Sequence, residues 1–247
     1  MSLNLKKYKK YNSKDLKEQI IKHIVALKEL SILSGNIFVS TKEERIKENK
    51  RKFFHILGGM ILPFAMIYIP QKICIILNII VLIPLLIADY NNWLLLFNKI
   101  PKGNIITQLL REHEIIKGKL NGLSWMLIGT LCIITLFDKY LASLSMAIFI
   151  ISDAVAALIG KNFGRIKICC NKTLEGTISF VLSSFIVYLF FTKFVFPKEV
   201  NFNILFMSLS IFVSSIVELF SKNINIDDNF SLPLSFCLTY TICISLI

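Results

Sequence analysis

The sequence predicts an all-α integral membrane protein, a polytopic bundle of about seven transmembrane helices with a basic N-terminal arm. Three observations lead to this prediction. The chain of 247 residues is 55% hydrophobic and carries a net charge of +12, and its mean hydropathy is +0.66. Apolar and basic residues must therefore be segregated along the chain, a pattern that an ordinary soluble domain does not have.

The arm, residues 1–50, is the basic part of the chain. Residues 1–55 carry 14 of the 28 Lys and Arg residues. We predict a modest amphipathic helix over 14–33 that lies on the membrane surface. The arm has no recognisable motif for reading a nucleic acid, so we expect anionic lipid headgroups as its partner and no nucleic acid.

Seven apolar runs follow the arm, and several are shorter than the roughly 20 residues that cross a bilayer upright. The first two are separated by little more than Pro70 and Gln71. They form either a tight hairpin of two spans or a re-entrant element, and we favour the hairpin. The runs cover residues 53–69, 73–88, 123–137, 141–159, 177–196, 204–219 and 230–247.

Charge asymmetry predicts the orientation of these spans. With seven spans and an inner N-terminus, the cytoplasmic segments hold 24 Lys and Arg residues and the opposite side holds four. The positive-inside rule then places the arm and the loops near 98–122, 160–176 and 220–229 in the cytoplasm, and the C-terminus outside.

The same topology brings the unusual polar residues to the cytoplasmic ends of the spans. Asp153 is the sharpest signal, because a carboxylate inside an apolar helix is costly and is kept mostly where it has a partner or a function. Small residues at helical spacing follow it, from Ala156 to Gly160 and Gly164. This strip allows either a neighbouring helix or a ligand to approach the backbone closely.

Two further segments combine charge with backbone-exposing residues. Lys161, Gly164 and Arg165, followed by the stretch from Lys172 to Thr177, would suit a polyphosphate. The alternative is an ordinary positively charged loop with a helix capped by Thr173.

Asp227, Asp228 and Asn229 precede the last span. Two carboxylates together with phosphate oxygens are a usual way of holding Mg²⁺. The alternative is a solvated turn that caps a helix.

At these residues the chain resembles the CTP-dependent lipid kinase family, which includes dolichol, phytol and eukaryotic diacylglycerol kinases and is related to the phosphatidate cytidylyltransferases. Five blocks match in order and span residues 51–247. They are Arg51-Lys-Phe-Phe-His55, Arg111-Glu-His-Glu114 with Asn121-Gly122, Ser152-Asp153 through Gly164-Arg165, Lys172-Thr-Leu-Glu-Gly-Thr177, and Val217-Glu218 with Asp228-Asn-Phe-Ser-Leu-Pro233. In many relatives a Gly stands at the position of Ser152.

The resemblance implies a catalytic domain over 51–247 that transfers the γ-phosphate of CTP, or of ATP, to a lipid alcohol in the bilayer. Phosphoryl transfer requires of the protein mainly that it position the reactants and neutralise charge. We therefore expect Asp153 and Asp228 to hold Mg²⁺, with Asp227 or Glu175 assisting. The expected nucleotide-binding residues are Lys161, Gly164, Arg165, Lys172 and Thr173, and the expected supporting residues are Arg51, His55, Arg111, Glu114, Asn121, Glu218 and Asn229.

Two other functions remain open. Cytidylyl transfer to phosphatidate would use the same residues with attack on the α-phosphorus, but the His-Gly-Gly of that branch is missing, and Asp228-Asn229 with Pro233 matches the kinase box. An ion-coupled transporter would use Asp153 and Glu218 as ion sites, but the chain shows no internal repeat. We also keep a homodimer open as an assembly state.

The predicted orientation is testable by cysteine-accessibility mapping in sealed vesicles. A reporter between residues 161 and 176 should be labelled from the cytoplasmic side, and a reporter at the C-terminus from the opposite side. Labelling of both positions from one side would mean an even number of spans, and the hairpin at Pro70 would be the first to be revised.

Overall fold

The computed structural model describes residues 42–91, 120–169, 172–198, 200–221 and 226–246. The chain divides into residues 1–41 and a compact unit, 42–247, and the fold described below is that of the second unit. Most of the predicted basic arm, including its helix over 14–33, lies outside the described residues, as do Arg111 and Glu114. The described part is helical apart from one isolated bridge between Lys167 and Thr173.

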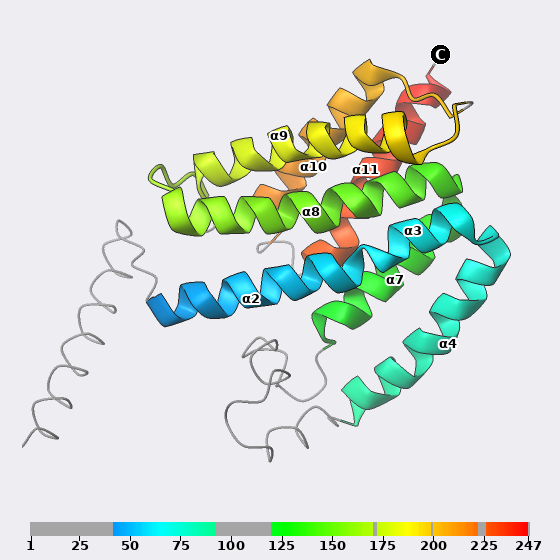
Figure 1. The fold of residues 1–247 in the computed structure, drawn as a ribbon, viewed down its shortest axis with the longest axis horizontal. Coiled ribbons are helices and arrows are strands. Elements are labelled where there is room, and N and C mark those ends of the chain that lie inside the picture. The colour runs from blue at the N-terminus through cyan, green and yellow to red at the C-terminus, as the bar shows by residue number, and fades with distance from the viewer. Residues whose placement is uncertain (1–41, 92–119, 170–171, 199, 222–225, 247) are drawn as a thin grey trace, which may run out of the picture. The chain divides into compact units, whose positions relative to one another are not determined.

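Helices cover all seven predicted apolar runs (Figure 1). Three of these helices are long and apolar enough to cross a membrane, namely α4, α8 and the continuous α9–η3, and α7 and α10 are shorter apolar helices. A multi-pass membrane protein follows, while the count of about seven spans and the orientation stay predictions. The elements are α2 (Lys42–Gly59), α3 (Ile61–Tyr68), α4 (Gln71–Tyr90), α7 (Gly122–Leu136), α8 (Lys139–Phe163), α9 (Leu174–Phe190), the π-helix η3 (Phe191–Val195), α10 (Ile204–Phe220) and α11 (Asp228–Ser245).

The first apolar run is interrupted at Met60, between α2 and α3. Pro63 lies three residues further on, and a proline ring removes a backbone donor and clashes with the carbonyl one turn earlier, which favours a break at this point. The connection from α3 to α4 is short, and Pro70 is the N-cap residue of α4. These two helices therefore form the predicted tight connection at Pro70.

The central element of the bundle is α8, which packs against α2, α3, α7, α9 and α11. Its fully buried residues include Leu144, Met146 and Phe149. By contrast, α4 buries only four of its 20 residues and exposes a row of isoleucines, as expected of a helix that faces lipid. The helix that carries Asp153 is thus the one enclosed by the others.

The small residues that follow Asp153 allow α9 to approach α8 closely. A Cβ atom added at Gly176 of α9 would lie 3.1 Å from the Ala156 carbonyl oxygen and 3.4 Å from the Gly160 Cα atom. Both of these neighbours are backbone atoms of α8, so they cannot move without shifting the helix. Of the two interpretations of the strip, the structure supports close packing of a neighbouring helix.

We therefore expect Gly176→Ala to lower the stability of the bundle by about 1–3 kcal/mol, as overpacking of a tight interface does. Gly58→Ala is the matched control, because a Cβ atom there meets nothing within 4 Å, and alanine is otherwise the better helix former. Thermal unfolding in detergent measures both variants. Equal unfolding temperatures would show that the α8–α9 contact is not tight.

Candidate functional site

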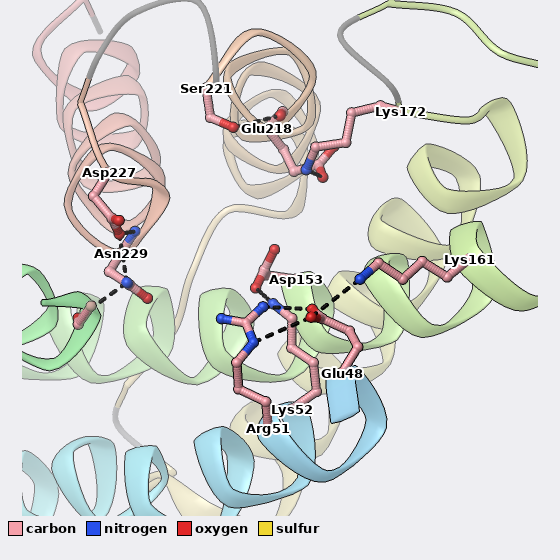
Figure 2. A network of polar contacts seen from close by, with 11 residues as sticks. Glu48, Arg51, Lys52, Asp153, Lys161, Lys172, Glu218, Ser221, Asp227 and Asn229 are labelled. Carbon is pink, nitrogen blue, oxygen red and sulfur yellow. Dashed lines mark hydrogen bonds and ion pairs between the residues drawn. The ribbon is translucent and has the colours of Figure 1, made fainter. Parts of the chain in front are cut away.

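Most of the polar side chains of the predicted blocks meet at one end of the bundle, which we call the polar end. At this end α8 and α10 finish and α9 and α11 begin. Figure 2 shows Asp153, Lys172, Glu218 and Asn229 approaching this region from α8, from the α8–α9 loop, from α10 and from α11. Residues widely separated in sequence are therefore brought into one site.

A buried ion pair between Lys52 and Asp153 joins α2 to α8. Only 4% of each residue is exposed, so each charge needs the other, because an unpaired buried charge is strongly destabilising. Lys52 belongs to the sequence block 51–55 at the start of the first span, but we did not predict it as a site residue. The available signal was the need of Asp153 for a buried cation.

A second ion pair joins Lys172, in the loop before α9, to Glu218 near the end of α10. Glu218 is only 3% exposed. Burial disfavours the charged form of Lys172, but the carboxylates of Glu218, Asp153 and Asp228 outweigh it and raise the pKa of Lys172 above its ordinary value. Lys172 is therefore a protonated cation among three carboxylates.

The start of α11 brings two further carboxylates to the site. Asp227 caps the helix, and its Oδ1 atom accepts hydrogen bonds from the Asn229 backbone N–H (3.0 Å) and from Asn229 Nδ2 (2.5 Å). The half-buried Asp228 carboxylate makes no hydrogen bond within the described part of the chain, although it contributes to the raised pKa of Lys172. The alternative of a helix cap thus holds for Asp227, whereas Asp228 keeps its oxygens available.

Two partly exposed ion pairs of Glu48, which we call the rim pairs, lie beside the buried Lys52–Asp153 pair. Glu48 of α2 binds Arg51 at 2.5 Å and Lys161 of α8 at 3.1 Å (Figure 2). Burial raises the pKa of Glu48, but Arg51, Lys161 and Lys52 together lower it to about 2. Glu48 is therefore ionised throughout the physiological pH range and holds two of the cations expected to bind phosphate or to support its binding.

The loop between α8 and α9 is braced by its own polar residues. The Glu175 carboxylate accepts hydrogen bonds from the backbone N–H groups of Arg165 (2.9 Å) and Ile166 (3.2 Å). Bonds from these groups and from its own backbone N–H lower the pKa of Glu175. The Thr173 hydroxyl caps α9 by accepting from the Gly176 N–H at 3.2 Å. Glu175 and Thr173 therefore shape the loop in this structure.

An open cavity of about 460 Å³ lies along the same loop. It is lined by Asn162, Phe163, Gly164, Arg165 and Glu175. Three of these residues, Gly164, Arg165 and Glu175, belong to the set predicted from the sequence. The loop thus combines a hollow with a guanidinium group and exposed backbone.

His55 lies on α2, three residues from Lys52, and is half-buried. Its ring packs edge-on against the ring of Phe149, with the ring centroids 5.6 Å apart, and its Nε2 atom has no hydrogen-bond partner among the described residues. His55 lies close enough to Lys52 and Asp153 for their charges to act on it, and its supporting role stays a prediction.

Among the described residues no group of three or more His, Cys, Asp or Glu side chains is arranged to hold a metal ion. Mg²⁺, however, is usually bound by one or two carboxylates and completes its octahedron with phosphate oxygens and water. Asp228, whose oxygens accept no hydrogen bond from the described residues, and Asp153 are carboxylates of the kind that this smaller requirement needs. The donors present therefore fit a magnesium ion that arrives with a nucleotide.

Comparison with known proteins identifies a relative that matches most of the chain. An uncharacterized protein of Rickettsia prowazekii is 33% identical over 202 residues, which cover 79% of this chain and 94% of that protein. No family model and no solved structure matches the chain.

Two lipid kinases of Saccharomyces cerevisiae match part of the chain. The CTP-dependent diacylglycerol kinase 1 is 29% identical over 142 residues, covering 51% of this chain and 48% of the kinase. Dolichol kinase is 36% identical over 84 residues, covering 34% of this chain and 16% of the kinase. The chain belongs to the same family as the Rickettsia protein and is a distant relative of the CTP-dependent lipid kinases.

Proposed function

We propose that this protein is a membrane-embedded lipid kinase that transfers the γ-phosphate of CTP to the hydroxyl group of a lipid. The observation that carries the proposal is the meeting of the buried ion pair Lys52–Asp153 and the partly exposed ion pair Lys172–Glu218 with the Asp228 carboxylate at one end of the bundle. The partial matches to two lipid kinases support the same reaction class.

The charges of the site suit a triphosphate. Phosphoryl transfer is promoted by cations that neutralise the phosphate oxygens and by groups that fix the geometry, with little covalent participation of the protein. Lys172 is protonated and 20% exposed at its side chain, so its ammonium group can donate to phosphate while Glu218 holds it in place. Arg165 lines the adjacent cavity.

The rim pairs give the triphosphate a place to enter. Lys161 is 34% exposed at its side chain, and within the described part of the chain its one ion pair is with Glu48. A partly exposed pair of this kind is weak, on the order of 1 kcal/mol or less. In this proposal a triphosphate, with its higher charge, displaces Glu48 from Lys161 and Arg51.

The carboxylates of Asp153 and Asp228 would bind the metal ion that accompanies the transferred phosphoryl group. Asp228 and Asp153 would hold Mg²⁺, which when bound neutralises charge on the β- and γ-phosphates. The lipid hydroxyl oxygen forms the new bond to the γ-phosphorus, the bond to the bridging oxygen breaks, CDP leaves and the hydroxyl proton is released. While holding Mg²⁺, Asp153 would also stay paired with the Lys52 ammonium group.

The runner-up is cytidylyl transfer to phosphatidate, since the same cations and carboxylates would serve attack on the α-phosphorus. The short Asp228-Asn229 box with Pro233 favours the kinase. The transporter is disfavoured because the sequence shows no internal repeat.

The decisive assay uses purified protein in lipid nanodiscs with CTP labelled at either the α- or the γ-phosphorus. The lipid panel contains a polyprenol, phytol, diacylglycerol and phosphatidate, and ATP is tested in parallel. Kinase activity moves only the γ-label into a lipid alcohol. Transfer of the α-label into phosphatidate would establish the cytidylyltransferase instead, and no transfer with any lipid would overturn both.

We expect Asp153→Asn and Asp228→Asn each to reduce lipid phosphorylation by at least about a hundredfold, because a metal contact on a transferring phosphoryl group is worth several kcal/mol in the transition state. Asp228→Asn should leave the unfolding temperature nearly unchanged, since its carboxylate makes no hydrogen bond with the described residues. Asp138→Asn is the matched control, because Asp138 caps the start of α8 by accepting from the Tyr140 N–H and asparagine is an equally good N-cap. Full activity in either of the first two variants would remove that residue from the metal site.

A further inference from the structure

Asp89 is a buried carboxylate at the end of α4 and is only 3% exposed. Most of α4 is exposed and apolar, and only three other residues of this 20-residue helix are buried. No ion pair is found for Asp89 in the part of the chain that the structure describes. A buried charge without a cation needs several hydrogen bonds to be tolerated.

Three hydrogen bonds satisfy the Asp89 carboxylate, and all of them come from the start of α7. Its Oδ1 atom accepts from Asn121 Nδ2 at 2.7 Å. Its Oδ2 atom accepts from the Asn121 backbone N–H at 3.1 Å and from the Ser124 hydroxyl at 2.6 Å. The positive end of the α7 dipole adds to these bonds. Asp89 therefore fixes the first turn of α7 with both of its oxygens.

The first turn of α7 in turn contacts the start of α11. Asn229 Nδ2 donates to the Gly122 carbonyl oxygen at 3.1 Å and to Asp227 Oδ1 at 2.5 Å. Two turns further along α7, a Cβ atom added at Gly129 would lie 2.8 Å from the Asn229 carbonyl oxygen. The two helices are thus in backbone contact at the residues that flank Asp228.

We propose that Asp89 is a positioning residue that fixes the Asp228 carboxylate through Asn121, Gly122 and Asn229. A simple helix cap would not need Asp89, because Asn121 Oδ1 already caps α7 by accepting from the Ser124 N–H at 2.8 Å. The Asp89 carboxylate instead clamps the Asn121 side chain and backbone together. This clamp fixes the position of the Gly122 carbonyl oxygen, which accepts the hydrogen bond from Asn229 Nδ2.

The reactive role of Asp228 rests on the proposed function, but the hydrogen-bond relay does not. A displacement of about 1 Å at a reacting centre can lower a rate about a hundredfold. Loss of Asp89 should therefore act on turnover more than on nucleotide affinity, because neither Asp89 nor its partners in α7 belong to the cations that would hold the triphosphate.

The test is a double-mutant cycle in nanodiscs that combines Asp89→Asn with Asn229→Ala. An asparagine keeps the volume of Asp89 but has only one acceptor oxygen for the three donors. Asp89→Asn should lower kcat for lipid phosphorylation at least tenfold and change KM for CTP less than threefold. Asp138→Asn is the matched control: Asp138 caps α8 by accepting from the Tyr140 N–H at 2.8 Å, and its loss should leave kcat within about twofold.

Coupling is the readout that a merely structural role would not produce. In the Asn229→Ala background, Asp89→Asn should have less than half of its effect on kcat and on the unfolding temperature, because the relay is already broken, whereas Asp138→Asn should be additive. If Asp89→Asn does not fold, Ser124→Ala replaces it, since that change removes one of the three donors without altering the carboxylate. Additive effects, or an unchanged kcat in Asp89→Asn, would overturn the proposal.

The unfolding-temperature cycle also separates this inference from the proposed function. If the parent protein phosphorylates no lipid, the proposed function fails, and a non-additive shift still supports the relay. If the parent protein is active and the cycle is additive in both readouts, the relay fails alone.

Discussion

The need to pair charges inside an apolar bundle governs the site of this protein. Asp153 lies on α8, the helix that the other helices enclose, and only 4% of the residue is exposed. Such a group is kept ionised only if a cation is brought to it, and α2 supplies Lys52 from more than 100 residues earlier in the chain. The charge of Asp153 can therefore be kept only if α2 packs against α8 and places Lys52 beside it.

The ion pairs differ in depth, and this difference suits the nucleotide site that we propose. Lys52–Asp153 is fully buried, and loss of one partner from such a pair costs about 3–5 kcal/mol. Glu48–Lys161 is partly exposed, and exposed ion pairs contribute about 1 kcal/mol or less. Between these extremes, Lys172 is held by the buried Glu218 and is partly exposed itself. In the proposed function the interior pair fixes the geometry, while the outer cations exchange Glu48 for a phosphate group.

The sequence was sufficient to predict the helical membrane class and the helices themselves, because long apolar runs and their interrupting polar segments are local features. It also predicted that Asp153, Lys172, Glu218 and Asp228 approach one another, because topology alone places the ends of alternate spans together. The partners were not predictable. Nothing local to Lys52 or Asp89 indicates that they bind Asp153 and Asn121, since those contacts depend on which helices pack together. The roles of Arg111 and Glu114 stay predictions, because these residues lie outside the described part of the chain.

The central claim is that the Lys52–Asp153 pair is retained for chemistry, although an apolar pair would serve the fold as well. The most direct test replaces both residues in Lys52→Met/Asp153→Leu and measures thermal unfolding and lipid phosphorylation beside the two single variants. Replacement of a buried ion pair by well-packed apolar residues is often neutral or stabilising. We predict that the double variant unfolds at or above the temperature of the parent protein, that both single variants unfold earlier, and that all three have lost phosphorylation. A double variant that is folded and phosphorylates lipid at the parent rate would contradict the claim.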